Sequence, residues 1–190
     1  MKKAVFTVLV DNYNPELCRK TIPTIRAYAD KIGAEYIIID KRKYPDFPPT
    51  YEKMQIYELG RGFDYCILID ADFIVDKNAP DFTEGISPGY VGVLEAFDAD
   101  AQFSKDECFI KDGRNIGLVS SLVVTDKKTH KAWEPLDLTW EEARQRTKRE
   151  FIIDEYCLSR NLAKYGFKFT GLNYNDEIKK LFYHLGATTK

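Results

Sequence analysis

Three short apolar runs, separated by two helical patterns, fill the first 70 residues of the chain. The runs are Ala4 to Val10, Tyr36 to Ile39 and Tyr65 to Ile69, and none of them alternates with polar residues. Continuous apolar runs of this length are typical of strands buried on both faces of a parallel sheet. Parallel neighbours need right-handed helical crossovers. The order therefore predicts an α/β fold with a Rossmann-like, mostly parallel central sheet flanked by helices.

Helix boundaries can be read between these runs. The Asn-Pro-Glu sequence at 14–16 favours a helix start, because it combines a capping side chain, a proline at the first helical position and an early acid. This helix is expected to end at Gly33. A second helix is expected to begin with Thr50 as its cap and to end before Gly60.

The second half of the chain is less regular. Thr139 opens a capping box, and Asp154 is expected to cap a helix that ends near Gly166. Short strands are expected at 90–94, 118–124, 167–170 and 181–183. Because no repeat, low-complexity tract or linker interrupts the chain, we expect one domain over 1–190. Its nucleotide-binding half would span about 1–76 and its acceptor-binding half about 77–190.

Composition excludes some classes of function. The 28 basic and 30 acidic residues nearly cancel, which disfavours nucleic acid as a partner. No apolar stretch has the roughly 20 residues that a transmembrane helix needs. The four cysteines form no Cys-x-x-Cys pair, so we expect free thiols in a reducing compartment and a cytoplasmic location. They are Cys18, Cys66, Cys108 and Cys157.

Two acids follow the third apolar run, at Asp70 and Asp72. In an extended chain alternate side chains share a face, so the two carboxylates are expected to converge while Ala71 points away. The carboxyl end of a parallel strand is also where open α/β sheets bind ligands. Two such acids suit Mg²⁺ or Mn²⁺, which completes its shell with substrate phosphate oxygens. Alternatively, Asp72 caps a turn and Asp70 is a solvated strand end.

The segment around these acids resembles a known family. Tyr-x-Lys-x-Gln-x-Tyr-Glu-Leu at 51–59, followed by Phe-Asp-Tyr-Cys-Ile-Leu-Ile-Asp-Ala-Asp-Phe-Ile-Val at 63–75, is similar to GT-A glycosyltransferases with an Asp-x-Asp motif. The similarity is greatest to the glycogenin and lipopolysaccharide galactosyltransferase group, and weaker to glycosyltransferase domains of large algal viruses. The resemblance implies that Asp72 binds manganese and that Asp70 contacts both the ion and the donor.

The same resemblance implies donor contacts elsewhere in this half. The base would lie after the first strand, near Asp11 and Tyr13, although either residue could instead form a turn or pack. Thr7, on that strand, and Ala71, between the two acids, are further candidate contacts. Lys53 either contacts the donor, as in the group, or extends along the surface with its charge in water.

Further matches follow in the order of the group. Asn115 precedes Ile-Gly-Leu, where the group has an Asn that contacts the donor sugar or lies close to it. The adjacent Arg114 could pair with phosphate or with an acid at Asp70 or Asp154. Asp154 and Glu155 stand where the group has an Asp-Gln pair beside the reacting sugar, so they are the candidate catalytic residues. Glu155 departs from the group's Gln.

The last seven residues resemble the group's closing His-x-x-Gly-x-x-Lys motif. It would make His184 a metal ligand, with Gly186 and Lys190 at the diphosphate. Gly186 comes one residue early, and the group's Pro-Trp is absent because the sequence stops at Lys190. Since the sequence ends on a substrate-binding lysine, we expect a domain cut from a longer polypeptide. A core histidine is the alternative for His184. A final acidic cluster, Glu95, Asp98 and Asp100, is either acceptor-binding or a solvated loop.

Taken with the acid pair, the resemblance implies a glycosyltransferase that moves a sugar from a nucleotide-diphosphate sugar to a hydroxyl acceptor such as a glycan. Mn²⁺ or Mg²⁺ is the expected cofactor, and the resemblance favours a UDP-sugar. Retention and inversion both stay open. One alternative is a haloacid-dehalogenase-like phosphatase, which would need its acids on the first core strand. The other is a non-catalytic nucleotide-sugar binding module, which would bind the donor without turnover.

Overall fold

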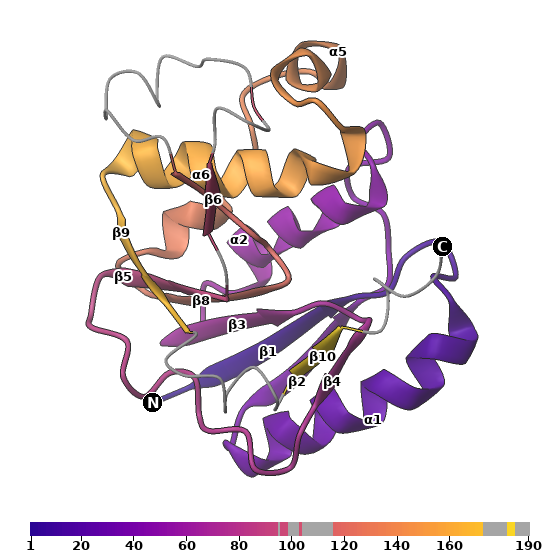
Figure 1. Ribbon diagram of the computed structural model, residues 1–190, viewed down its shortest axis with the longest axis vertical. Coiled ribbons are helices and arrows are strands. Elements are labelled where there is room, and N and C mark those ends of the chain that lie inside the picture. Colours follow the sequence, from indigo (N-terminus) through magenta and orange to yellow (C-terminus); the bar gives the residue numbers. More distant parts are fainter. Residues whose placement is uncertain (95, 99–102, 104–115, 173–181, 185–190) are drawn as a thin grey trace.

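A six-stranded sheet forms the centre of the protein (Figure 1). The computed structural model describes residues 1–94, 96–98, 103, 116–172 and 182–184. The strand order is β2-β1-β3-β8-β5-β9, and only β8 runs against its neighbours among these six. The strands are β1 (Lys3–Val8), β2 (Glu35–Ile39), β3 (Tyr65–Ile69), β5 (Tyr90–Val93), β8 (Leu122–Asp126) and β9 (Lys168–Gly171). The predicted mostly parallel α/β sheet is confirmed.

Two short antiparallel ribbons lie beside the main sheet. β4 (Phe73–Val75) pairs with β10 (Phe182–His184), and β6 (Ala96–Asp98) pairs with β7 (Ile116–Leu118). The single strand expected over 118–124 is wrong, because this run divides between β7 and β8. A turn at Ser120 and Ser121 separates the two strands, and the Ser120 side chain is used to bind buried charges.

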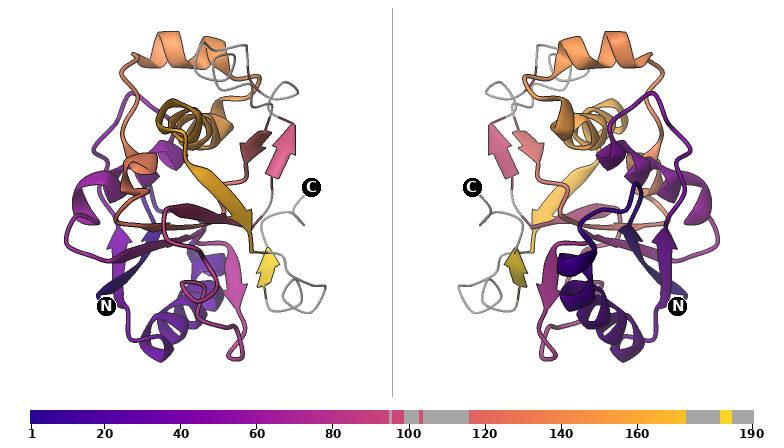
Figure 2. Two further views of the ribbon diagram at one scale, coloured as in Figure 1. Left: turned by 90° about the vertical axis from the view of Figure 1, so that its left-hand side faces the viewer. Right: turned by 90° about the vertical axis from the view of Figure 1, so that its right-hand side faces the viewer.

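Helices cover both faces of the sheet (Figures 1 and 2). The long helix α1 (Pro15–Lys31) packs on one face, while α2 (Ile56–Leu59), α5 (Trp140–Ala143) and α6 (Ile153–Tyr165) lie on the other. Side chains alternate between the two faces along each strand. Phe6 and Leu68 therefore belong to the core under α6, while Val5 and Ile67 belong to the core under α1.

Local signals explain where α1 begins and ends. The Asn14 side chain accepts a hydrogen bond from the Leu17 backbone N–H at 3.2 Å, and Pro15 is the first helical residue. The chain leaves the helix through Gly33, whose φ of 66° favours glycine. Both predicted ends of α1 are confirmed.

The helix expected after Thr50 takes a different form. A 3-10 helix, η1 (Pro49–Gln55), leads into the short α2, and Thr50 does not cap it. The Thr50 hydroxyl instead donates to the Phe151 carbonyl at 3.2 Å. Pro49 already occupies the helix start, so Thr50 falls inside the first turn rather than before it.

The later helices also depart in part from expectation. Thr139 forms the predicted capping box, but α5 ends after four residues and continues as η3 (Arg144–Arg146). Asp154 does not cap α6, which begins at Ile153 directly after η4 (Glu150–Ile152). The Asp154 carboxylate is bound by other buried groups instead. The predicted end of α6 at Gly166, with φ 65°, is confirmed.

Two wider expectations concern membranes and thiols. Across the described ranges, no helix combines the length and apolar character that crossing a membrane requires. The three described cysteines, Cys18, Cys66 and Cys157, are free thiols, and Cys108 lies outside the described residues.

Candidate active site

A pocket of about 230 Å³ opens at the carboxyl ends of β1 and β3. These strands are parallel neighbours, so the segments that follow them meet at one edge of the sheet. Six of the predicted donor or metal contacts line the pocket: Asp11, Tyr13, Lys53, Asp70, Ala71 and Asp72. Val8, Val10, Pro49 and Thr50 complete the lining. The fold thus brings together side chains from β1, η1 and β3.

The two acids leave β3 in a tight turn rather than in the extended form expected. The Phe73 backbone N–H donates to the Asp70 carbonyl at 3.2 Å. The Thr21 hydroxyl, from α1, donates to the Ala71 carbonyl and ties the turn to that helix. Although the chain turns, Asp70, Ala71 and Asp72 all line the pocket.

Lys53 is buried and binds one acid of each predicted pair, Asp70 and Asp154. Its side chain is 5% exposed, and its Nζ lies 2.8 Å from Asp70 Oδ1 and 2.8 Å from Asp154 Oδ2. Nζ also donates to Ser120 Oγ at 3.0 Å. A lysine that extends along the surface is therefore excluded. Burial disfavours its charged form, but the two carboxylates outweigh that effect and raise the pKa of Lys53.

Asp70 and Asp72 differ in environment. Burial raises the pKa of Asp70 to about 6, and the Lys53 ammonium opposes that rise. Asp72 accepts a hydrogen bond from the Tyr13 hydroxyl at 3.3 Å. Burial, and then the charge of Asp72, raise the pKa of Tyr13 to about 12, so the phenol keeps its proton.

Asp154 and Glu155 lie behind this pair, on the first turn of α6. Asp154 is 1% exposed and accepts from the Ser120 hydroxyl at 2.6 Å. Among the described residues, its other carboxylate oxygen has no hydrogen-bond partner. Burial, followed by the charge of Asp154, raises the pKa of Glu155 to about 7. Glu155 is only partly buried, whereas Asp154 is enclosed.

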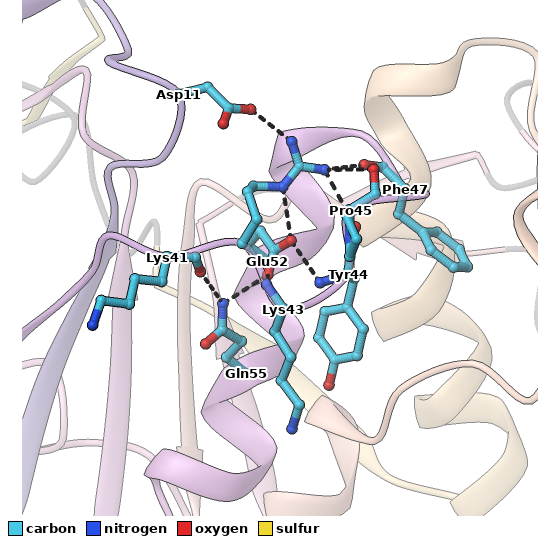
Figure 3. Close-up of polar contacts among 9 residues, drawn as sticks. Asp11, Lys41, Lys43, Tyr44, Pro45, Phe47, Glu52 and Gln55 are labelled. Carbon is cyan, nitrogen blue, oxygen red and sulfur yellow. Dashed lines mark hydrogen bonds and ion pairs between the residues drawn. The ribbon is translucent and has the colours of Figure 1, made fainter.

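A second polar cluster borders the pocket at Asp11 (Figure 3). Arg42 binds Asp11 through Nη1 at 2.6 Å and the buried Glu52 through Nε at 2.8 Å. Sequence reasoning did not identify Arg42, Glu52 or Ser120. Arg42 lies within Lys-Arg-Lys in a polar loop, which reads as solvated, and no spacing in the sequence connects it to Asp11.

The remaining predicted residues fall into two groups. Thr7 is fully buried and donates to the Ile69 carbonyl at 3.0 Å, so the structure gives it a packing role rather than the expected donor contact. At His184 the backbone of β10 pairs with Phe73, the residue after Asp72. The other predicted positions lie outside the described residues: Glu95, Asp100, Arg114, Asn115, Gly186 and Lys190.

The acid pair can be tested for its fit to a cation. Carboxylate oxygens are the ligands that Mg²⁺ and Mn²⁺ prefer. Within the described ranges, no group of three His, Cys, Asp or Glu side chains forms a complete metal cage. Two acids beside a pocket instead fit an ion that takes further oxygens from a bound diphosphate. The side chains present are therefore compatible with Mn²⁺ or Mg²⁺.

The sheet order and the likeness to solved structures define the class by its fold: the chain has the GT-A fold. No protein-family model matches the sequence, and no curated protein matches it. Solved structures supply the likeness. A glycosyltransferase involved in glycosylation of the major capsid of PBCV-1 has a TM-score of 0.60 at 11% identity, with 100% of this chain and 95% of that chain covered.

Two animal enzymes have the same fold. A mutant of Drosophila β-1,4-galactosyltransferase 7, in complex with manganese, UDP-Gal and xylobiose, has a TM-score of 0.55 at 14% identity over 97% of this chain and 71% of that one. Mouse xyloside xylosyltransferase 1, in its apo form, has a TM-score of 0.56 at 11% identity over 100% of this chain and 99% of that chain. At such identities the likeness establishes the fold.

Proposed function

We propose that this protein is a glycosyltransferase that transfers a sugar from a nucleotide-diphosphate sugar to a hydroxyl acceptor, with Mn²⁺ or Mg²⁺ as cofactor. One observation carries the proposal: Asp70 and Asp72 line the same pocket as Asp11 and Tyr13, at the carboxyl edge of β1 and β3. The GT-A fold supports the same conclusion. The phosphatase alternative loses support, because its acids would follow the first core strand rather than β3.

The pocket has one side for the nucleoside and one for the diphosphate. We assign Asp11 and Tyr13 to the nucleoside and Asp70 and Asp72 to the cation. A bound cation would neutralise the charge that develops on the leaving diphosphate. Lys53 would hold the Asp70 carboxylate in place. A UDP-sugar is favoured because the Drosophila neighbour is a complex with manganese and UDP-Gal.

The two acids of α6 receive different roles. We propose that Asp154 is a positioning residue, because it is 1% exposed and binds Lys53 at 2.8 Å. Glu155 is our candidate catalytic residue, since it is partly exposed and its pKa of about 7 allows proton exchange near neutrality. His184, whose backbone pairs with Phe73, stays a proposed metal ligand. Arg114, Asn115, Gly186 and Lys190 stay proposed donor contacts.

Calorimetry of nucleotide binding tests the cation. UDP and GDP should bind with Mn²⁺ present, and a chelator should weaken binding by more than about tenfold, because cation and diphosphate bind as a unit. Asp72→Asn should weaken binding similarly while keeping the side-chain shape. The matched control is Asp40→Asn, which makes the same change at an exposed acid directly after β2. Equal affinity after chelation would rule out the proposed metal role.

Turnover separates an enzyme from a binding module. A panel of nucleotide sugars, scored by thermal shift with Mn²⁺, identifies the donor, because the ligand bound most tightly raises the midpoint most. The enzyme should then release nucleoside diphosphate when a glycan acceptor is added. Donor binding without release would favour the binding module, and no shift with any donor would oppose both.

A further inference from the structure

Arg42 connects the pocket to the interior through contacts on three sides. Nη1 binds Asp11 Oδ2 at 2.6 Å, and Nε binds Glu52 Oε1 at 2.8 Å. Nη2 donates to three carbonyls of the following loop, those of Tyr44, Pro45 and Phe47. The Arg42 side chain is 22% exposed, so this fork is largely enclosed. A guanidinium is suited to such a junction, because its donors have fixed directions.

The anchor of this junction is Glu52 on η1, which is fully buried. Its carboxylate accepts from the backbone N–H groups of Lys43 and Tyr44, both at 2.9 Å, and from Gln55 Nε2 at 2.7 Å (Figure 3). A buried carboxylate with this many donors has little freedom to move. Arg42 is therefore held from the interior side, and its Nη1 is presented toward Asp11.

Asp11 needs such a support. Its φ of 55°, like that of Asn12, lies in the left-handed region that residues other than glycine seldom adopt. Such a backbone persists where its surroundings hold it. Half of the Asp11 side chain is exposed, at 52%, and it lines the pocket. The ion pair with Arg42 holds this exposed side chain through one of its carboxylate oxygens, Oδ2.

The same 3-10 helix also serves the other side of the pocket. Glu52 anchors Arg42, and its neighbour Lys53 binds Asp70 at 2.8 Å. Glu52 and Lys53 are thus consecutive buried residues of opposite charge on η1. Glu52 is connected to Asp11 through Arg42, and Lys53 binds Asp70 directly. The short distance along η1 sets the spacing between the nucleoside end and the diphosphate end of the pocket.

We propose that Arg42 is a positioning residue for donor binding, which acts through Asp11 without contacting the donor. It would fix Asp11 so that Oδ1 accepts a hydrogen bond from an N–H or O–H group of the nucleoside. This inference rests on the proposed function. It adds that a residue behind the pocket controls affinity for the nucleoside part of the donor and leaves the diphosphate part unaffected.

The test measures binding of the nucleotide and of its charged end separately. The probes are UDP or GDP, whichever wild type binds more tightly with Mn²⁺, and inorganic pyrophosphate with Mn²⁺. Arg42→Met should weaken nucleotide binding about tenfold, the scale of one charge-assisted hydrogen bond, and leave pyrophosphate affinity unchanged. Lys43→Met is the matched control. It removes a cation from the same loop, where Lys43 pairs with Glu58 rather than Asp11, and should change neither affinity.

Two further variants keep the test decisive. Arg42→Lys keeps a positive charge beside Glu52 and protects folding, but a single ammonium cannot reproduce the fork between Asp11 and Glu52. It should weaken nucleotide binding by a smaller factor. Asp11→Asn should weaken nucleotide binding as Arg42→Met does. The double variant should bind the nucleotide as tightly as each single variant, because both changes disrupt the same interaction between Asp11 and the nucleoside.

The possible outcomes are distinct. Additive losses in the double variant would show that Arg42 acts on the donor independently of Asp11 and would overturn the proposal. Unchanged nucleotide affinity in folded Arg42→Lys and Arg42→Met would also overturn it and leave Arg42 a role in stability alone. Failure of wild type to bind UDP, GDP or pyrophosphate with Mn²⁺ would instead refute the proposed function, and this inference with it.

Discussion

Removal of the buried cation at Lys53 should destabilise the protein strongly. Lys53→Met leaves Asp70 and Asp154 without the ammonium that lies 2.8 Å from each carboxylate. Loss of one partner from a buried ion pair costs about 3–5 kcal/mol, against roughly 5–15 kcal/mol for the unfolding of a whole domain. For a chain of this length, that corresponds to a fall of about 6–20 °C in Tm. The variant should still fold, with a much smaller free energy of unfolding than wild type.

The cost should depend on pH in a defined direction. Burial raises the pKa of Asp70 from 3.8 to about 6 even though Lys53 lowers it. Without Lys53, the folded-state pKa rises further above the unfolded value. A raised carboxyl pKa favours the folded state below the unfolded pKa, and this advantage is lost as pH rises through the folded pKa. The Lys53→Met penalty should thus be smallest near pH 4 and largest near pH 8.

Urea unfolding at both pH values measures this penalty. Adding Asp154→Asn to Lys53→Met should recover part of the lost stability, because it removes one uncompensated buried charge. Lys20→Met, at an exposed lysine of α1, is the control and should stay within about 0.5 kcal/mol of wild type. A Lys53→Met cost below about 1 kcal/mol at both pH values would refute the reasoning that Lys53 compensates these two acids.

Two further predictions concern stability elsewhere in the chain. Because the pKa of Glu155 is raised from 4.5 to about 7, its ionisation lowers the free energy of unfolding as pH rises between those values. The free energy of unfolding of Glu155→Gln, relative to that of wild type, should therefore increase by on the order of 1–3 kcal/mol from acid to alkaline pH. Parallel urea-unfolding profiles against pH would contradict this expectation. Gly60→Ala would place its Cβ 2.6 Å from Cys66 Sγ and 2.7 Å from the Ile56 carbonyl oxygen, and it should cost about 1–3 kcal/mol in thermal unfolding. Gly62→Ala, with no atom within 4 Å of its Cβ, is the control, and an equal cost for both variants would show that crowding at Gly60 is not the cause.

The fold was predictable from the sequence where signals are local. Apolar runs gave the strands, and Asn14 and Gly33 marked the ends of α1, because capping and left-handed turns depend on neighbouring residues. The pocket at Asp70 and Asp72 was also predictable, since parallel strands place their carboxyl ends on one edge. Within the candidate site, six predicted residues line this one pocket.

Predictions failed where distant groups compete for a side chain. Asp154 has the sequence context of an N-cap, but the buried ammonium of Lys53 binds it more strongly than a backbone N–H would. Thr50 likewise donates its hydroxyl hydrogen bond to the Phe151 carbonyl instead of capping η1. Arg42 and Glu52 form a cluster whose existence depends on how a loop folds over η1. No periodicity or spacing encodes contacts of this kind.

The pairing of β4 with β10 has a consequence for the order of folding. β4 directly follows the acid pair, yet its partner strand is made roughly a hundred residues later in the chain. During synthesis from the N-terminus, β1, β2 and β3 can associate early, while the strand beside Asp72 must wait until residues 182–184 have emerged. The edge of the pocket next to Asp72 is therefore expected to become native later than the pairing of β1, β2 and β3.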